Sequence, residues 1–549
     1  MNDASRRTAL VVIASSVGTA FEWYDFFLFG TLASLISGKF TAGSKTAGFL
    51  FILGAFAAGF IVRPFGAVFF GHIGDRHGRK SAFLLTIVLM GAATTAIGLL
   101  PTIQSIGVAA PLLLVATRVV QGFAMGGEYG GAAVYVAEHA QSGRRGFLTG
   151  WIQSTAALGL LLAVAAVLGV RVLIGERAFG EWGWRVPFLF SAILLALSLW
   201  IRLKLGESPV YQRMRAQMAV ARAPLREALR GENLRRIGLA LVCILLAQGA
   251  VWYTAHFYAQ FFLEQVLKVD APRVNLLIMA AVLLSAPGYL FFGWLSDRVG
   301  RKPVMLAGMG LTLLLYFPGF HALTSAANPA LVRAARAAPV VVVADPASCH
   351  TQFDVLGRHP ARSACDVLRT TLADGGIPNH LIGQGRDGWA AVYIAGTPAV
   401  QGTVAHLDER QQSDEMARLA HSLKAALQAS GYGSKADRVE MKLPLILGIL
   451  LLLMLASTAL YGPQAAALAE LFPTSIRYTA LSVPYNIGVG WVGGLLPVSA
   501  FALVAATGDI YSGLYYPLVF TAISFICCWL WLPETSGQAL QQTGEHHVS

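Results

Sequence analysis

Charged side chains are scarce in this chain of 549 residues: Asp, Glu, Lys and Arg make up 13% of it, whereas hydrophobic residues make up 56%. An average soluble domain has roughly 25% charged residues, so a soluble protein of this length could not cover its surface with so few. The same composition excludes an intrinsically disordered chain. The 57 glycines follow no triplet period, which excludes collagen. The composition is that of a polytopic membrane protein.

Cysteine and acidic residues are also few. Cys243, Cys527 and Cys528 lie in apolar runs and are expected to be packing residues. No metal-ligand spacing is present, and we expect no metal and no cofactor. The 41 Lys and Arg against 29 Asp and Glu give a net charge of +12. No basic run is interleaved with aromatic residues, so we expect no nucleic-acid partner.

Twelve apolar runs are long enough to cross a bilayer, which takes about 20 residues. They lie at 9–36, 46–71, 81–101, 110–137, 147–173, 185–205, 237–266, 275–294, 303–323, 443–469, 480–506 and 513–532. The first run is too long for a signal peptide and contains Glu22 and Asp25, so we interpret it as an uncleaved span.

The chain is therefore predicted to be an all-α polytopic membrane protein with twelve transmembrane helices in two six-helix halves. A small α/β insert outside the membrane is expected between helices nine and ten. The predicted parts are an N-terminal half (1–205), a cytoplasmic linker (206–236), helices seven to nine (237–324), the insert (325–441), helices ten to twelve (442–532) and a cytoplasmic tail (533–549).

The distribution of Lys and Arg predicts the orientation. With the N-terminus inside, 20 of them fall in cytoplasmic segments and seven in the short external loops. Cytoplasmic loops carry the excess of basic residues, so both termini are expected in the cytoplasm and the insert in the periplasm.

A ten-residue segment is repeated after the second and the eighth predicted spans. Gly71-His-Ile-Gly-Asp-Arg-His-Gly-Arg-Lys80 and Gly293-Trp-Leu-Ser-Asp-Arg-Val-Gly-Arg-Lys302 share six of ten positions. An Ala-Glu pair followed by Arg recurs after spans four and ten, at Glu138 and Arg145 and at Glu470 and Arg477. Such repetition indicates two related halves.

The twelve spans and the duplicated loop resemble the major facilitator superfamily. Phe21-Glu-Trp-Tyr-Asp-Phe26, Arg63-Pro-Phe-Gly66, Arg118-Val-Val-Gln-Gly122, Gly126-Gly-Glu-Tyr-Gly130, Trp182-Gly-Trp-Arg-Val-Pro-Phe188 and Glu470-Leu-Phe-Pro-Thr-Ser-Ile-Arg-Tyr478 are similar to its metabolite:H⁺ symporter family, which includes shikimate, α-ketoglutarate, citrate and proline/betaine permeases. The resemblance implies a monomeric transporter of the bacterial inner membrane, not an enzyme. It would take up a small metabolite, an organic acid, with protons by alternating access.

Other functions remain open at this point. The fifth predicted span has no Gly-Pro pair, which disfavours a drug antiporter. An antiporter or facilitator for another organic solute remains an alternative. A receptor-like or enzymatic membrane protein would instead act through the insert.

Ionisable residues inside the spans are the candidates for proton coupling and substrate binding, because charge in hydrocarbon is costly. Glu22 and Asp25 lie one turn apart and share a helix face. Arg118, Gln121 and Glu128 share a face of span four. Arg118 needs an anion, either a carboxylate of the protein or the substrate, and a swap between the two would couple them. A permanent structural ion pair is the alternative.

Weaker candidates complete the predicted site. Arg63 in span two is expected to bind an anionic substrate or to anchor a cytoplasmic network. Tyr253 and His256 lie at helical spacing on span seven, and Tyr485 and Asn486 lie on span eleven. Amphipathic packing explains these four residues equally well.

The duplicated loop predicts a cytoplasmic gate made of charged pairs. Its members are Gly71, Asp75, Arg79, Glu138, Arg145, Asp297, Arg301, Glu470 and Arg477. Each aspartate would meet the N-terminus of a neighbouring helix, and the pairs would break for inward opening.

The polar insert is predicted to be a small α/β domain. Strands are expected at 339–344 and 389–395, and helices at 364–373 and 408–430. Cys349 and Cys365 would share an oxidising compartment, which favours a disulfide, with free thiols as the alternative. No catalytic motif appears, and the insert is expected to limit access to the transporter or to contact a periplasmic partner.

Overall fold

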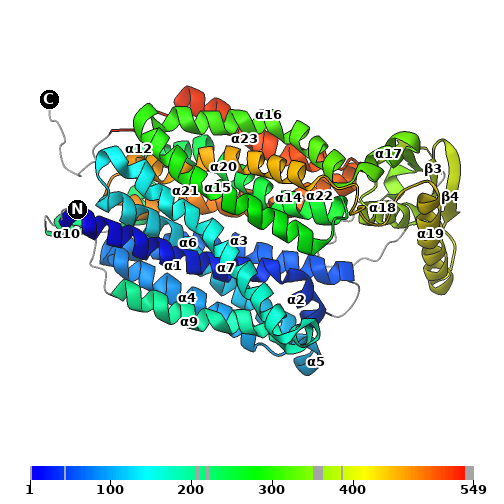
Figure 1. Cartoon of the computed structure of the whole chain (residues 1–549), viewed down its shortest axis with the longest axis horizontal. Coiled ribbons are helices and arrows are strands. Elements are labelled where there is room, and N and C mark those ends of the chain that lie inside the picture. The colour runs from blue at the N-terminus through cyan, green and yellow to red at the C-terminus, as the bar shows by residue number, and fades with distance from the viewer. Residues whose placement is uncertain are drawn as a thin grey trace.

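The computed structural model describes residues 3–41, 45–203, 209–216, 223–349, 363–384 and 388–537 (Figure 1). The long helices of the N-terminal part are α1 (Asp3–Thr31), α3 (Lys45–His77), α4 (Arg79–Leu99), α6 (Ala109–His139), α7 (Arg145–Ile174) and α9 (Arg185–Leu203). Those of the C-terminal part are α12 (Gly231–Ala240) with its continuation to Val266, α15 (Ala271–Val299), α16 (Arg301–Ala327), α20 (Leu443–Leu471), α21 (Arg477–Tyr485) with α22 (Gly494–Thr507), and α23 (Tyr515–Trp531).

Each predicted span coincides with a helical segment. In the described residues, ten helices are long and apolar enough to cross a membrane, or eleven if a bent pair that includes α9 is one span. The helix α1 is 29 residues long and is not among them. Its two carboxylates, on Glu22 and Asp25, lower its mean hydropathy. The count of twelve spans therefore stays a prediction.

Three spans depart from regular α-helix. The seventh is interrupted by π-helical turns at Leu241–Leu245, Thr254–Tyr258 and Phe262–Val266. The eleventh contains a longer π segment, Asn486–Gly493, between α21 and α22. A short π turn, Phe179–Gly183, precedes α9. Each π turn rotates the residues that follow it relative to an α-helical pattern, and such turns occur frequently at functional sites.

The two halves form separate layers of the bundle. Figure 1 shows the N-terminal helices, in blue and cyan, below the C-terminal helices, in green to red. Glycines allow close packing inside the N-terminal layer: a Cβ on Gly122 would lie 2.0 Å from the carbonyl oxygen of Gly59, and one on Gly126 would lie 2.2 Å from that of Arg63. The backbones of α3 and α6 therefore touch, and this contact fixes the position of Arg63.

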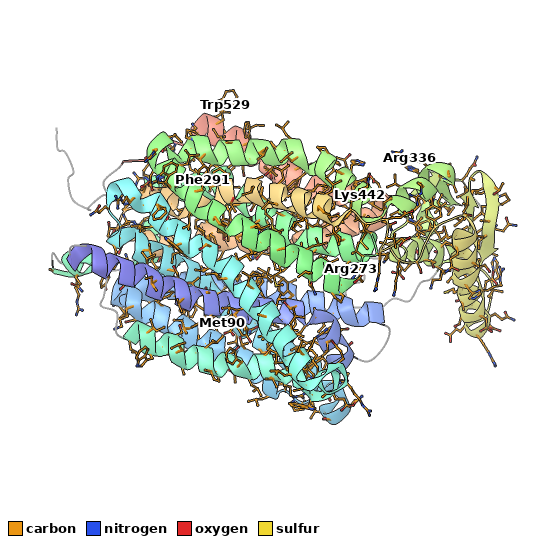
Figure 2. The ribbon with its side chains drawn as sticks, in the orientation of Figure 1. Met90, Arg273, Phe291, Arg336, Lys442 and Trp529 are labelled. Carbon is orange, nitrogen blue, oxygen red and sulfur yellow. A yellow bond between two sulfur atoms is a disulfide. The ribbon has the colours of Figure 1, made fainter. Side chains whose placement is uncertain are left out.

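The outer surface of the bundle is apolar. Side chains such as Phe291 and Trp529 point away from the helices (Figure 2) and are 52% and 64% exposed. Exposed apolar side chains over many helices match a surface that faces lipid.

The insert forms a compact body at one end of the bundle, opposite to the end where α1 begins (Figure 1). Its sheet has the order β2-β1-β3-β4, from β1 (Val340–Ala344), β2 (Asn379–Gly383), β3 (Trp389–Ile394) and β4 (Thr397–Thr403). The first pair is parallel and the other two pairs are antiparallel. The helices α18 (Ala364–Asp374) and α19 (Glu409–Ala429) match the predicted helices closely.

Two strands were not predicted. The sequence of β2 contains Asn, His and Gly, and that of β4 contains Pro and Gly, all of them residues that are rare in strands. Both strands lie at the edges of the sheet, where such residues are tolerated. Cys349 and Cys365 are joined by a disulfide, which ties the end of β1 to the start of α18.

The insert is docked onto the C-terminal half. The amide of Asn379 donates to Gly508 O at 3.0 Å, and Arg369 donates to Ala506 O at 2.7 Å. The amide of Ala436 donates to Lys268 O at 3.2 Å. These bonds tie the insert to the C-terminal ends of the seventh and eleventh spans.

A charged pair lies at the same junction. Burial raises the pKa of the Asp374 carboxyl, and the ammonium groups of Lys268 and Lys424 oppose this rise. Burial likewise lowers the pKa of Lys268, and Asp374 opposes that shift. Asp374 is exposed and Lys268 is half-buried, so the two opposite charges attract each other at the edge of the junction.

A glycine pair tests how tightly the insert is docked. Gly376 and Gly396 both have positive φ, 65° and 79°, so alanine costs each of them a similar backbone strain of about 1 kcal/mol. A Cβ at Gly376 would lie 2.0 Å from the carbonyl oxygen of Val266, whereas one at Gly396 would meet nothing within 4 Å. We expect Gly376→Ala to lower the unfolding temperature of the purified protein by roughly 2–4 °C more than Gly396→Ala does. Equal shifts would contradict the docked arrangement.

Candidate functional site

Asp75, at the end of α3, binds the N-terminus of α21 in the other half. Its carboxylate accepts hydrogen bonds from the amides of Tyr478 (3.3 Å) and Thr479 (2.9 Å) and from the Thr479 hydroxyl (2.7 Å). It also pairs with Arg79, which in turn lies 3.9 Å from Glu138. A carboxylate at a helix N-terminus is stabilised by the unpaired amides and the helix dipole.

Asp297, at the end of α15, makes the corresponding contact in the opposite direction. Its carboxylate accepts hydrogen bonds from the amides of Gly146 and Phe147, both 2.8 Å, at the start of α7. Arg301 lies 2.7 Å from Asp297 and 3.1 Å from Glu470. The contacts of the two aspartates are thus equivalent under an approximate twofold symmetry between the halves.

Two further ion pairs connect the halves. Arg477 of the C-terminal half lies 3.0 Å from Glu138 of the N-terminal half, and Arg145 lies 3.4 Å from Glu470. All four side chains are buried. Together with Asp75, Asp297, Arg79 and Arg301 they form what we call the gate network. The structure brings together the charged residues predicted for the gate.

Glycines in the duplicated loop permit this contact. A Cβ on Gly71 would lie 2.9 Å from Cα of Thr479, and one on Gly293 would lie 2.4 Å from the carbonyl oxygen of Gly146. The repeated glycine is therefore needed because backbone from the other half lies directly against it.

The segment after the last span also joins the gate network, which the sequence analysis missed. Glu534 accepts hydrogen bonds from the amides of Arg301 (2.8 Å) and Lys302 (3.1 Å), and Thr535 donates to Glu470 at 3.1 Å. The start of the predicted cytoplasmic tail is therefore part of the packed structure.

A buried polar cluster surrounds Asp25 on α1. The Ser191 hydroxyl donates to Asp25 at 2.5 Å, and Thr94 and Glu22 lie beside the same carboxylate. Arg118 donates to Gln121 at 2.5 Å, and Gln121 donates to Thr94 at 2.6 Å. A chain of polar side chains thus runs from Arg118 to Asp25.

Arg118 itself lies among aromatic rings. Its guanidinium carbon is 4.1 Å from the ring centre of Phe29, 5.3 Å from that of Phe56 and 5.8 Å from that of Phe26. No ion pair between Arg118 and a carboxylate is found in the described part of the chain. The connection to Asp25 runs through Gln121 and Thr94, a route that the sequence analysis did not anticipate.

Arg63 and Glu128 line a cavity between the halves, here called the Arg63 cavity. The side chains of its walls leave room for about one water molecule. Its walls come from both halves: Thr19, Trp23, Arg63, Met125, Glu128, Ile152, Gln153 and Ala156 from the first, and Tyr461 from the second.

A second cavity of similar size, the His256 cavity, is lined by Trp252, His256 and Gln260 among others. His256 stacks on Trp252, with 4.5 Å between the ring centres, and its Nδ1 bonds Trp252 O at 2.9 Å. Tyr253 does not line this cavity: its ring packs on Phe60, beside Arg63. The π turn at 254–258 separates the two residues that the sequence placed on one face.

Aromatic side chains from both halves meet between the two cavities. Trp23 lies 5.9 Å from Trp252, and Phe257 lies 5.8 Å from Phe27 and 6.3 Å from Phe56. Along α1, Trp23 precedes Phe27, so this aromatic layer lies on the insert side of the Arg63 cavity. The gate network lies on the opposite side of the Arg63 cavity, toward the C-terminal end of α3.

Tyr485 and Asn486 connect helices near the Arg63 cavity. The Tyr485 hydroxyl lies 3.1 Å from that of Tyr461, a cavity residue. The Asn486 amide donates to Gly126 O of the other half and to Ser482 O, both at 2.8 Å. Neither residue is among those that line the Arg63 or the His256 cavity, and both contact neighbours of the Arg63 cavity.

Several polar residues escaped the sequence analysis. Gln248 and Gln464 are fully buried and have no hydrogen-bond partner for either amide atom among the described residues. Gln153 and Tyr461 line the Arg63 cavity. Gln248 and Gln464 are each a single polar residue inside an apolar run, and that signal could have identified these two.

Comparison with known proteins identifies the fold. A family model described as Major Facilitator Superfamily matches residues 15–343, more than half of the chain. The chain belongs to the major facilitator superfamily. A model described as Sugar (and other) transporter matches residues 425–546 of this superfamily member. Residues 344–424, which neither model matches, fall within the insert.

Relatives support the narrower resemblance. The shikimate transporter of Escherichia coli (strain K12) is 38% identical over 330 residues, 58% of this chain and 73% of that protein. The glycine betaine/proline/ectoine/pipecolic acid transporter OusA of Dickeya dadantii (strain 3937) is 27% identical over 97% of this chain and 85% of that protein. A structure of the proton:xylose symporter XylE, bound to 6-bromo-6-deoxy-D-glucose, has a TM-score of 0.61 at 16% identity and covers 98% of each chain. This superfamily member is thus a transporter and not an enzyme.

The two aspartates of the gate network provide a reciprocal test. Asp75→Asn removes the negative charge from the N-terminus of α21, and Asp297→Asn removes it from that of α7. Because hydrogen bonds to charged groups contribute about 1.5–3 kcal/mol, we expect Asp75→Asn to speed amide hydrogen exchange at Tyr478 and Thr479 by roughly tenfold.

In Asp75→Asn, amide exchange at Gly146 and Phe147 is the control and should stay unchanged. In Asp297→Asn we expect the reverse, with faster exchange at Gly146 and Phe147 and no change at Tyr478 and Thr479. Equal acceleration at both helix starts in either variant would indicate general loosening and contradict two separate contacts.

Proposed function

We propose that this protein takes up a small carboxylate-bearing metabolite together with protons, by alternating access. The observation that carries the proposal is the buried cluster of Asp25, Thr94, Gln121 and Arg118, which shares α1 and α6 with the wall of the Arg63 cavity. A carboxylate in a low-dielectric interior is costly when charged, so Asp25 is suited to take up and release a proton during the cycle.

The arrangement of the two closures supports alternating access. The gate network closes one side of the Arg63 cavity, and the aromatic layer closes the other. Both closures are made between the halves, so a rocking motion of one half against the other can open one while keeping the other shut. The ion pairs of the gate network break for inward opening.

Coupling would pass through the polar chain. When Asp25 releases its proton, the new negative charge attracts the Arg118 guanidinium, whose present partner is Gln121. Movement of Gln121 would change the packing between α6 and α4, because Gln121 also bonds Thr94. This replaces the direct swap expected from the sequence with a relayed one.

The names of the relatives support the substrate class. Shikimate, proline and betaine, which appear in the names of similar transporters, all contain a carboxylate. Arg63 and Arg118 provide two buried cations in this region. An organic acid or another carboxylate-bearing solute is therefore the proposed cargo.

Transport in proteoliposomes tests symport. We expect an inward proton gradient to drive accumulation of a labelled substrate drawn from a panel of organic acids, shikimate and betaine. Asp25→Asn should abolish this response and retain exchange of substrate across the membrane, because exchange needs no net proton movement. Asp270→Asn, which changes an external carboxylate outside the cluster, is the control. Transport that ignores the gradient would indicate a facilitator, and the opposite response an antiporter.

The distribution of basic residues supports a bacterial inner-membrane topology with cytoplasmic termini and a periplasmic insert. Glu409 in the insert and Arg230 before the seventh span are both exposed. In intact cells we expect an impermeant maleimide to label Glu409→Cys and not Arg230→Cys. Background should be low, since Cys243, Cys527 and Cys528 are buried. The reverse labelling pattern would contradict the orientation.

A further inference from the structure

Arg63 differs from the other buried arginines of the bundle. Four of them, Arg79, Arg145, Arg301 and Arg477, have carboxylate partners. Arg118 donates to Gln121 and lies among three phenylalanine rings.

Arg63 is 2% exposed, and among the described residues its Nε and Nη1 have no hydrogen-bond partner. Its neighbours are the ring of Phe60, 5.2 Å from the guanidinium carbon, and Tyr253.

Unsatisfied donors on a buried cation are costly. Burying a charge without a partner is far more expensive than burying a neutral polar group, and native proteins satisfy nearly all buried polar atoms. The Arg63 side chain reaches the wall of a cavity between the halves. A ligand carboxylate in that cavity would supply the missing acceptors, and arginine binds carboxylates in a two-pronged geometry.

The remaining walls of the Arg63 cavity do not suit a simple anion. Glu128 places a carboxyl group of the protein on the same cavity, and Trp23 and Tyr461 add two aromatic rings. A carboxylate and aromatic faces both attract a cationic nitrogen, and aromatic cages recognise quaternary ammonium groups. A ligand with only a negative charge would be attracted by Arg63 and opposed by Glu128.

Both features fit one class of ligand. We propose that the Arg63 cavity binds a small zwitterion, with its carboxylate on Arg63 and its cationic nitrogen toward Glu128, Trp23 and Tyr461. In this arrangement of the halves the wall side chains leave room for little more than one water molecule, so the ligand enters when the halves move apart. This inference deepens the proposed transport function and rests on it for its biological meaning, but binding itself requires no gradient.

Matched probes separate the two charges. Glycine betaine carries both charges, 3,3-dimethylbutanoate replaces its nitrogen with carbon, and choline lacks the carboxylate. L-Proline and cyclopentanecarboxylate form a second pair. With the purified full-length protein and no gradient, calorimetric titration should show at least one zwitterion binding roughly tenfold or more tighter than its singly charged analogues.

Variants then assign each charge to a residue. Arg63→Gln should weaken binding of glycine betaine and dimethylbutanoate and leave choline unchanged. Glu128→Gln should weaken glycine betaine and choline and leave dimethylbutanoate unchanged or tighter. Arg171→Gln and Glu176→Gln, which alter a surface pair 3.4 Å apart at the end of α7, are the matched controls.

The proposal is overturned if neither zwitterion binds, or if each carbon analogue binds the wild type as tightly as its zwitterion. It is also overturned if Arg63→Gln and Glu128→Gln change all ligands by the same factor. The probe series on the wild type alone decides the ligand class even where a variant does not fold. Betaine binding without gradient-driven uptake would reject symport and support this inference, whereas gradient-driven uptake of plain carboxylates alone would do the reverse.

Discussion

The closed arrangement of the bundle depends on two carboxylates that each bind the N-terminus of a helix in the opposite half. Asp75 and Asp297 each pair with an arginine four residues later in the chain. Each also accepts hydrogen bonds from backbone amides of the other half. Because these contacts join helices of different halves, the strength of the contacts influences how easily the halves separate. The two cavities and the aromatic layer lie between the halves, whereas the polar cluster around Asp25 lies inside the N-terminal half.

Within the bundle, buried charge is distributed unequally. The arginines of the gate network have carboxylate partners, whereas the two arginines nearer the middle of the spans are held by an amide and by aromatic rings. The difference distinguishes the gate-network arginines, which join helices, from Arg63 and Arg118, which are the candidates for interaction with a ligand or a titrating carboxylate. A buried guanidinium without a full set of partners destabilises the fold, and Arg63 and Arg118, the residues proposed for transport, are of this kind.

The sequence predicted the gate network well because its residues recur in a duplicated segment, and duplication marks the same contact twice. It predicted the membrane helices from apolar length, and it failed to separate Tyr253 from His256 because a π turn is not encoded in residue periodicity. It missed Gln153, Gln464 and Tyr461, since single polar residues in an apolar run do not reveal which helix they face. The edge strands β2 and β4 were missed because their residues have low strand propensity and depend on pairing with β1 and β3.

The described hydrogen bonds that join the insert to the membrane helices run to the C-terminal half, at Lys268, Ala506 and Gly508. Bundles of two similar six-helix halves are difficult to orient in single-particle electron microscopy, because they have little mass outside the detergent belt and nearly repeat themselves on rotation. Here the chain carries its own reference mark: a folded, disulfide-closed body whose described residues are hydrogen-bonded to the C-terminal half. It breaks the pseudo-symmetry of the particle images and marks which half has moved, so different states of the transport cycle can be aligned without an added antibody fragment.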